Sequence, residues 1–317
     1  MTQYLITGVA GFIGSNIARA LLSKAAEQGG MRVRGIDDFS TGRRENLVDL
    51  DGLELIEGDI SRAEDIQRAM EGVDYVIHQA AIPSVSRSVD DPIRTHHANV
   101  TGTLQVLEAA RVAGAKRVVY AASSSAYGDT PTLPKVETMK ERPLSPYAVS
   151  KLAGEHYVSV YSKVFGLPAV ALRYFNVFGP HQDPNSQYAA AIPKFIRCVL
   201  RGESPTIFGD GTQTRDFTHV DNVVEANLKA LEAPEEDVSG EVFNIACGER
   251  IDLLQLLEEI YRILGKRVEP VFSPTRPGDV RDSLADITKA REKLGYTASV
   301  GLREGLERTA GWYRGSL

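Results

Sequence analysis

The sequence contains few cysteines and no long hydrophobic run. Its two cysteines, Cys198 and Cys247, lie far apart and outside any CxxC spacing, so we expect neither a disulfide framework nor a metal site. No segment approaches the roughly 18 consecutive apolar residues of a transmembrane helix, and no membrane partner is expected. The start of the chain lacks the basic region and apolar core of a secretory signal, which predicts a cytoplasmic protein.

An excess of positive charge is also absent. The net charge of −6 at pH 7 and the pI of about 5.6 disfavour a sequence-independent nucleic-acid surface. The hydrophobic share of 43% and the charged share of 25% are ordinary for a soluble globular protein. A chain of 317 residues can form two domains, or one large domain with an appendage. Any anionic ligand would therefore need a local cationic pocket.

The first half of the chain alternates short apolar runs with helical stretches. This alternation predicts an α/β fold, with a doubly wound parallel sheet of the Rossmann type covered by helices on both faces. The predicted strands are 4–8, 32–37, 53–59, 75–81, 117–124 and 169–179, and the first three helical stretches are 13–28, 62–70 and 101–114.

The regular alternation of strands and helices ends beyond Gly179. Segments rich in glycine and turn residues follow, and then a long predicted helix at 253–265. We predict a cofactor-binding domain over 1–177 and a smaller C-terminal α/β substrate domain over 178–317. The boundary is soft, because part of about 216–248 has the pattern of a helix and a strand that return to the first domain.

Three glycines lie between the first predicted strand and the first predicted helix. Gly8, Gly11 and Gly14 follow the spacing GxxGxxG. Glycine permits a tight turn and close backbone approach, and a helix N-terminus attracts phosphate, so this turn is a candidate pyrophosphate cradle for a dinucleotide. The alternative is that these glycines serve packing alone.

Acidic residues follow the second and third predicted strands. Asp37 stands where a carboxylate accepts hydrogen bonds from the adenosine ribose hydroxyls, which favours NAD over NADP. Arg43 and Arg44 follow closely and weaken that inference. Asp59 either accepts a hydrogen bond from the adenine amine or caps the helix that begins near Ser61.

The segment SPYAVSK, residues 145–151, places a tyrosine and a lysine four residues apart. Ser145 is a good N-cap and Pro146 a good first helical residue, so a helix is predicted to begin here. Tyr147 and Lys151 would then share one face. The simplest interpretation of the pair alone is a half-buried tyrosine beside a solvated lysine.

Several motifs occur in order: GxxGxxG, HQAA (78–81), SSSAYG (123–128), SPYAVSK and RYFNVFG (173–179). With these motifs the chain resembles the extended short-chain dehydrogenase/reductase superfamily over essentially its whole length. Within it, the sequence is most similar to the UDP-hexose 4-epimerases, including those that act on N-acetylated sugars. The resemblance implies an NAD cofactor, a UDP-sugar substrate and a homodimer built through helices near 101–112 and 147–165.

The resemblance also implies a catalytic role for the tyrosine and the lysine. Tyr147 would act as the base, and Lys151 would lower the pKa of the phenol and bind the nicotinamide ribose. Counting back from Tyr127 selects Ser123 as the hydroxyl that relays the proton. Ser124 and Ser125 remain possible contacts to the sugar.

The remaining site residues follow from the same resemblance. For single arginines a surface ion pair, and for apolar residues core packing, are the alternatives. The candidate cofactor contacts also include Phe12, Ile13, Ile60, Ala80, Ala81, Asn99 and Tyr174. The candidate substrate contacts are Asn176, Arg215 and Arg276 at phosphate, Asp279 at the uridine ribose, Ala190, Ile207 and Phe208 at uracil, and Ser283 at the sugar.

The residue types at 123–125, which we call the serine turn, also distinguish related enzyme activities. Sugar-nucleotide 4,6-dehydratases carry an Asp-Glu pair after the hydroxyl residue, where this chain has Ser124 and Ser125. UDP-glucuronate decarboxylases carry a glutamate at the second of these positions. UDP-glucuronate 4-epimerase remains an alternative, because small hydroxyl residues suit a sugar carboxylate. A non-catalytic NAD-sensing regulator is disfavoured by the joint presence of Ser123, Tyr147 and Lys151.

Overall fold

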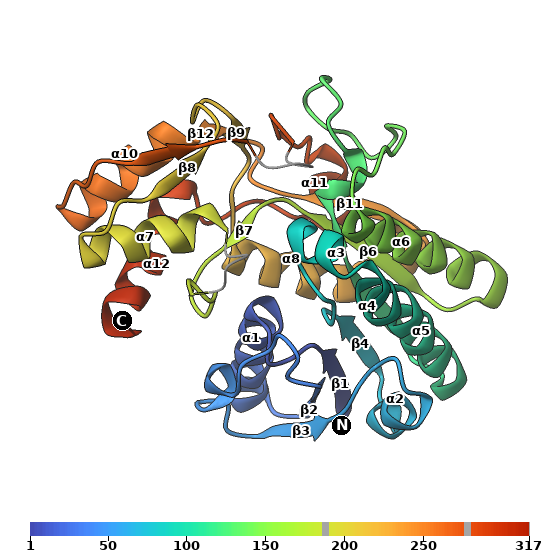
Figure 1. Cartoon of the computed structure of the whole chain (residues 1–317). Helices are drawn as coiled ribbons and strands as arrows, with labels where there is room; N and C mark the ends of the chain where they lie inside the picture. Colours follow the sequence, from blue (N-terminus) through green and yellow to red (C-terminus); the bar gives the residue numbers. More distant parts are fainter. Residues whose placement is uncertain (186–189, 276–279, 317) are drawn as a thin grey trace.

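The computed structural model describes residues 1–185, 190–275 and 280–316. Its centre is a seven-stranded sheet with the order β11-β6-β5-β4-β1-β2-β3 (Figure 1), in which every pairing is parallel. The strands are β1 (Thr2–Thr7), β2 (Met31–Asp37), β3 (Leu53–Glu57), β4 (Tyr75–His78), β5 (Arg117–Ser123), β6 (Ala169–Tyr174) and β11 (Val242–Ile245).

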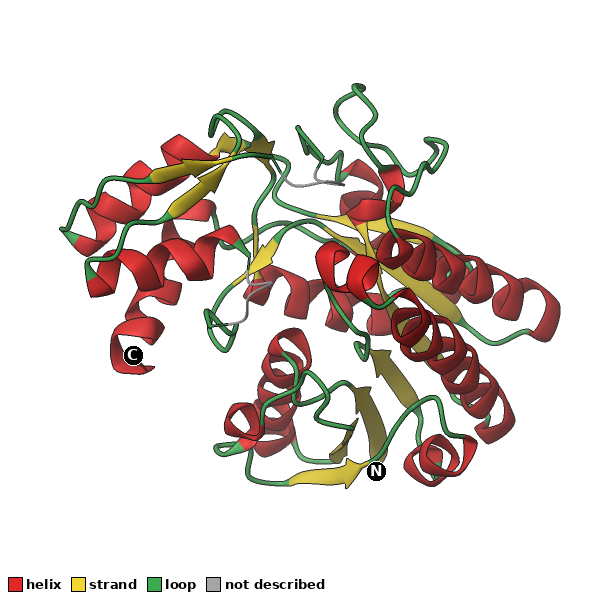
Figure 2. Ribbon diagram, viewed as in Figure 1, coloured by secondary structure: helices red, strands yellow, loops and turns green. Residues whose placement is uncertain are grey.

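Helices cover both faces of this sheet (Figure 2). The alternation of side chains along each strand supplies two apolar faces, as Leu5 and Ile6 of β1 show by packing into different core clusters. The predicted doubly wound fold is therefore confirmed. One face packs against α1 (Phe12–Gln28), α8 (Val220–Glu232) and α11 (Thr288–Leu294), and the other against α2 (Ala63–Met70), α5 (Gly102–Ala113) and α6 (Pro146–Phe165).

The sixth predicted strand is shorter than the sequence suggested. β6 ends at Tyr174, because Asn176 adopts a positive φ of 35° that extended backbone does not allow. The chain then forms β7 (Val177–Phe178), which pairs with β10 (Thr218–His219) away from the main sheet. This turn directs the chain from the sheet edge toward the second lobe.

The second lobe has a core of its own, which includes Phe195, Ile207 and Leu256. β8 (Thr206–Phe208) pairs with β13 (Val271–Ser273), and β9 (Thr214–Arg215) pairs with β12 (Ile251–Asp252). The helices of this lobe are α7 (Ala191–Arg201), α10 (Leu253–Leu264) and α12 (Leu302–Ser316).

Short elements complete the fold and carry several site residues. They are η1 (Arg44–Leu47), α3 (Val85–Asp90), α4 (Pro92–His96), η2 (His97–Thr101), η3 (Ser124–Tyr127) and α9 (Glu235–Val238).

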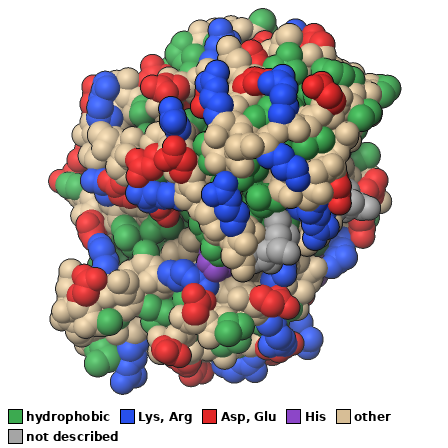
Figure 3. All heavy atoms as spheres, turned by 90° about the vertical axis from the view of Figure 1, so that its left-hand side faces the viewer, with side chains coloured by type: hydrophobic (Ala, Val, Ile, Leu, Met, Phe, Trp, Pro, Cys, Tyr) green, Lys and Arg blue, Asp and Glu red, His purple; other side chains and the backbone are tan. Residues whose placement is uncertain are grey.

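Acidic and basic side chains are interspersed over the face seen in Figure 3. Within the described ranges, no helix is long and apolar enough to cross a membrane. The same residues contain no group of three or more His, Cys, Asp or Glu side chains arranged to hold a metal ion.

Candidate functional site

Two cavities meet at the carboxyl ends of the parallel strands, the edge where open α/β sheets bind ligands. One, of about 420 Å³, lies over the glycine turn, and the other, of about 530 Å³, lies between the sheet and the second lobe. We call them the cofactor cavity and the substrate cavity. The residues that line both are Ile13, Ser84, Ala122, Tyr147, Tyr174 and Ala190.

The glycine turn leaves no space for side chains. Gly8 has a φ of 69°, and a Cβ on it would lie 2.6 Å from Ala80 Cα. A Cβ on Gly14 would lie 2.2 Å from the Gly8 carbonyl oxygen. Gly11 is the N-cap of α1 and offers no side-chain cap, so the first amides of the helix face the cofactor cavity. The turn thus has the shape and polarity that a pyrophosphate requires.

Asp37 ends β2 and lines the cofactor cavity with its carboxylate fixed in place. Its Oδ2 accepts from the Ala10 amide at 2.8 Å and its Oδ1 from the Phe39 amide at 2.9 Å. Burial raises the pKa of this carboxyl, and the two amides oppose that shift. A carboxylate has further lone pairs, so Asp37 can still accept from ribose hydroxyls.

The two arginines after Asp37 pair with other carboxylates. Arg43 lies 3.4 Å from Asp183, whereas Arg44 lies 2.6 Å from Glu57 and stacks over the Phe39 ring. These ion pairs reduce the cationic character of the ribose end of the cavity. The described residues therefore fit NAD.

Asp59 and six further predicted cofactor residues line the cofactor cavity, whereas Asn99 does not. Asp59 lines the cavity and accepts from Ser61 N and Oγ, both at 2.8 Å, in the turn before α2. The N-cap of α2 is Arg62, without a side-chain cap bond, so Asp59 does not cap this helix, and its adenine contact remains a prediction. Phe12, Ile13, Ile60, Ala80, Ala81 and Tyr174 also line the cavity.

Asn99 is not among the residues that line the two cavities, and its direct cofactor contact stays a prediction. Its side chain is buried and its amide is occupied within the protein. Oδ1 accepts from Ile82 N at 2.7 Å, and Nδ2 donates to Ile82 O at 3.2 Å and to Ser150 Oγ at 3.0 Å. Asn99 therefore fixes the backbone at Ile82, which forms part of the cavity wall.

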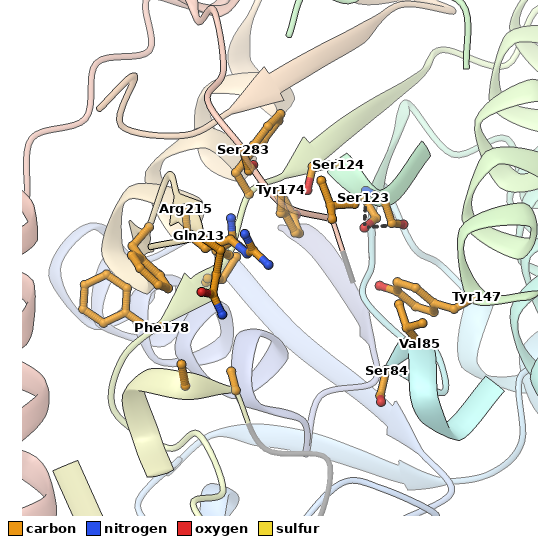
Figure 4. Close-up of a pocket in the computed structure, with 18 of the residues that line it drawn as sticks. Ser84, Val85, Ser123, Ser124, Tyr147, Tyr174, Phe178, Gln213, Arg215 and Ser283 are labelled. Carbon is orange, nitrogen blue, oxygen red and sulfur yellow. Dashed lines mark hydrogen bonds between the residues drawn. The ribbon is translucent and has the colours of Figure 1, made fainter. Parts of the chain in front are cut away.

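The helix that carries the tyrosine and the lysine begins as predicted. The Ser145 hydroxyl accepts from Ala148 N at 3.1 Å, and Pro146 is the first residue of α6. Tyr147 points its hydroxyl into the substrate cavity (Figure 4). Lys151 is only 4% exposed and donates to the Ala121 carbonyl at 2.8 Å.

In the chain alone, burial governs the pKa values of Tyr147 and Lys151. Burial raises the pKa of Tyr147, and the nearby Ser123 hydroxyl opposes the rise. Burial also lowers the pKa of Lys151 to about 8. The Lys151 ammonium donates to the Ala121 carbonyl and lies one helical turn from the phenol, where a positive charge favours the phenolate.

The serine turn lies at the end of β5, opposite Tyr147 (Figure 4). Ser123 Oγ accepts from Ser125 N at 3.2 Å and from Ser125 Oγ at 2.9 Å. With two bonds accepted, the Ser123 hydroxyl still has its proton to donate. Ser123, Ser124 and Ser125 all line the substrate cavity.

The second lobe contributes polar groups to the opposite wall. Arg215 and Gln213 reach into the substrate cavity across from Tyr147 (Figure 4). Arg215 Nη1 is held by the carbonyls of Thr214 and Arg281, and Asn176 Nδ2 donates to Asp216 O at 3.0 Å. The other predicted residues on this cavity are Ala190, Phe208 and Ser283.

Ile207 is not among the residues that line the substrate cavity, and its uracil contact stays a prediction. Its side chain is fully buried in the core of the second lobe. Alternation along β8 instead places Thr206 and Phe208 on the cavity side. Arg276 and Asp279 lie outside the described residues.

Residues 4–246 match the model of the NAD dependent epimerase/dehydratase family. The chain belongs to this family. It is 41% identical to a UDP-glucose 4-epimerase of Mycolicibacterium smegmatis, with 98% of each chain covered. It is 38% identical to the UDP-N-acetylglucosamine 4-epimerase of Methanobrevibacter ruminantium solved with UDP-N-acetylmuramic acid, with a TM-score of 0.93 over 100% of this chain and 99% of that one. It is 36% identical to the UDP-glucuronic acid 4-epimerase of Bacillus cereus solved with UDP-glucuronic acid and NAD, with a TM-score of 0.91 over the whole of both chains.

Several lining residues of this family member were missed by sequence reasoning. Ser84 and Val85 lie beside Tyr147 because α3 packs against α6. Gln213 lies in the loop just before β9, so strand alternation gives no signal for it. Lys135 and Asp282 reach the cavity through long loops, for which the sequence pattern contains no signal.

Proposed function

We propose that the protein catalyses the reversible, NAD-dependent inversion of C4 of UDP-hexoses through a 4-keto sugar, interconverting UDP-glucose and UDP-galactose. The observation that carries this proposal is the position of Tyr147, at the junction of the cofactor and substrate cavities and facing the serine turn that includes Ser123. A sugar bound there has one face toward the cofactor cavity. The family relationship independently supports an epimerase.

Bound NAD supplies the hydride acceptor and donor for the reaction. The residues of the chain supply proton transfer and position. Tyr147 removes the proton of the 4-hydroxyl and later returns it, while Ser123 hydrogen-bonds the same oxygen and relays the proton. Lys151, fixed by the Ala121 carbonyl, keeps a positive charge one helical turn from the phenol.

Inversion requires the 4-keto sugar to present its other face while the nucleotide stays bound. Asn176 and Arg215 hold the diphosphate, since a guanidinium can donate paired hydrogen bonds to phosphate. Ala190 and Phe208 flank the uracil. The substrate cavity of about 530 Å³ encloses the ligand without immobilising the hexose.

We propose that the enzyme also accepts the 2-acetamido sugars, UDP-N-acetylglucosamine and UDP-N-acetylgalactosamine. Ser283 lines the substrate cavity, and its amide donates to the Thr214 carbonyl at 3.1 Å, so this small residue is part of the wall. A small residue leaves room for the 2-substituent as the sugar turns.

UDP-glucuronate is the alternative substrate, favoured by the hydroxyls of Ser124 and Ser125 on the cavity wall. Two other lining residues favour a neutral hexose. Lys135 already donates to the carbonyl and hydroxyl of Thr130 and to the Thr132 carbonyl, and Asp282 adds a carboxylate to the same cavity.

The experiment that tests this function is a substrate panel. Purified protein is incubated separately with UDP-glucose, UDP-N-acetylglucosamine and UDP-glucuronate, and the products are separated by chromatography. C4 epimers of the first two support the proposal. Conversion of UDP-glucuronate alone supports the alternative, and conversion of none contradicts both.

We further propose a cytoplasmic homodimer that forms through α5 and α6. In the single chain these helices expose apolar side chains that a partner would cover, and such clusters are uncommon on surfaces without a partner. The exposed residues are Val112 on α5 and Val149, Val160, Val164 and Phe165 on α6.

A further inference from the structure

A segment of the second lobe forms one wall of the cofactor cavity. Residues 180–185, which we call the crossing segment, follow β7. Its residues His181, Gln182 and Asp183 line the cavity together with the glycine turn and Asp37. The cofactor site is therefore assembled from both lobes.

The crossing segment is anchored on both sides. On the second lobe, Tyr313 Oη donates to the Gln182 carbonyl, and the His181 ring lies 4.9 Å from the Trp312 ring. On the sheet side, Asn16 Nδ2 of α1 donates to the Pro180 carbonyl at 3.1 Å. These contacts hold Asp183 at a defined place.

Arg43 faces Asp183 from the loop that follows Asp37. The Arg43 amide donates to the Ala10 carbonyl at 2.9 Å, and Gly42 lets this loop pack onto Asp37, because a Cβ there would lie 2.7 Å from Asp37 Oδ1. Arg43 lines the cofactor cavity, and its Nη1 lies 3.4 Å from Asp183 Oδ1.

The Asp183 carboxylate is itself oriented. Its Oδ1 accepts from the Asn185 amide at 2.9 Å within the crossing segment. Glu45 is the other carboxylate near Arg43, at 3.5 Å from Nε, but it does not line the cavity. Asp183 is thus the partner that neutralises Arg43 on the cavity side.

We propose that Asp183 is a positioning residue for cofactor selection, which acts through Arg43 to exclude NADP and retain NAD. An arginine near the adenosine ribose is the group that accommodates a 2′-phosphate in dinucleotide sites. By pairing with Arg43, Asp183 holds that guanidinium away from a phosphate and adds a second carboxylate to the cavity that Asp37 lines. The same ion pair joins the two lobes across the cavity. The inference rests on the proposed NAD-dependent function.

Asp183→Asn isolates the charge, because the amide oxygen can still accept from Asn185 N. The NAD-loaded wild-type and variant enzymes are incubated with excess NADP, and bound nucleotides are separated by gel filtration and quantified by mass spectrometry. We expect the preference for NAD over NADP to fall roughly three- to tenfold in Asp183→Asn, the range for gaining one charge-assisted phosphate contact in a partly exposed site. NAD should also dissociate faster.

Two further variants test whether the effect of Asp183 on nucleotide preference depends on Arg43. Glu45→Gln removes the other carboxylate near Arg43 and should leave the preference at the wild-type value. Arg43→Gln combined with Asp183→Asn should abolish the gain in NADP binding.

An unchanged preference in Asp183→Asn overturns the inference, and so does a lowered preference that persists without Arg43. Wild-type protein that binds neither nucleotide would instead contradict the proposed function. The two failures are therefore distinguishable.

Discussion

Lys151 is a buried cation one helical turn from Tyr147, the proposed catalytic base. Replacing it by methionine removes a positive charge that favours the phenolate, so the apparent pKa of the catalytic base should rise. The acidic limb of the pH–rate profile should then move to higher pH, and less NAD should remain bound after purification. A pH profile of kcat together with the nucleotide content measures both effects. If the acidic limb of the pH–rate profile stayed at the wild-type pH, Lys151 would not lower the pKa of the base.

The same substitution should change how stability depends on pH. Burial lowers the pKa of Lys151 from 10.5 to about 8, so between these values the unfolded chain binds this proton and the folded protein does not. Stability should therefore increase as the pH rises through this window in the wild type, and less so in Lys151→Met. Denaturant unfolding at several pH values serves as the check.

We propose that Ser283, on the wall of the substrate cavity, limits the size of the sugar 2-substituent. Ser283→Tyr would place a ring in the substrate cavity, where overpacking costs roughly 1–3 kcal/mol, or about 5- to 150-fold in rate. We expect this loss on the acetylated pair and a much smaller one on UDP-glucose and UDP-galactose. Ser283→Ala is the matched control and should retain both activities. Equal losses on both pairs in the tyrosine variant would remove Ser283 from the specificity argument.

Single residues also show what a sequence can predict. Ser145 and Pro146 predicted the start of α6 because capping is a local property of the chain. Asn99 and Ile207 were assigned to ligands, yet the structure gives the Asn99 amide three internal partners and buries Ile207 in a core. Such assignments depend on contacts between distant segments, which motifs do not specify.

The elements were predictable wherever periodicity alone decides them. The alternating pattern located every strand of the first half and also α8 and β11. The pattern predicted a sixth strand that runs past the end of β6. The strand ends early because Asn176 has a positive φ and because β7 pairs with β10, about 40 residues further along the chain. Lys135 and Asp282 reach the cavity on loops without periodicity and were therefore missed.

The glycine turn gives a prediction at the scale of an element. In Gly14→Ala the new Cβ would meet the Gly8 carbonyl oxygen at 2.2 Å, so the turn must open and the pyrophosphate cradle is lost. We expect the purified Gly14→Ala protein to contain no bound NAD. The NAD content is measured as the nucleotide released on denaturation. Gly311→Ala, in α12 where a Cβ meets nothing within 4 Å, is the control and should keep NAD and gain about 0.5–1 kcal/mol of stability. Full NAD occupancy in Gly14→Ala would refute the cradle.

At the scale of the whole molecule, Tyr147 lies where the cofactor cavity and the substrate cavity meet. The sheet edge supplies the cofactor cavity and the second lobe closes the substrate cavity. The boundary near residue 177 remains a prediction, since α8 and β11 return to the sheet after the second lobe has begun. This arrangement explains why catalytic and nucleotide-binding residues come from distant parts of the sequence.

The proposed homodimer can be tested at the same scale. Light scattering should give twice the chain mass of 34.6 kDa for the wild type. Val160→Asp would bury a charge in the α5–α6 interface and should yield monomers. Val48→Asp, at a valine that is 81% exposed and away from these helices, should remain dimeric. A monomeric wild type would contradict the proposal.

The central claim is that Tyr147 performs acid–base chemistry at C4 of a UDP-hexose. The most direct test compares wild-type protein with Tyr147→Phe in the conversion of UDP-glucose to UDP-galactose, with bound NAD quantified in both. The account predicts that the phenylalanine variant keeps its NAD and loses at least about 10²-fold in turnover, the usual scale of general acid–base catalysis. Wild-type turnover in Tyr147→Phe would contradict the account.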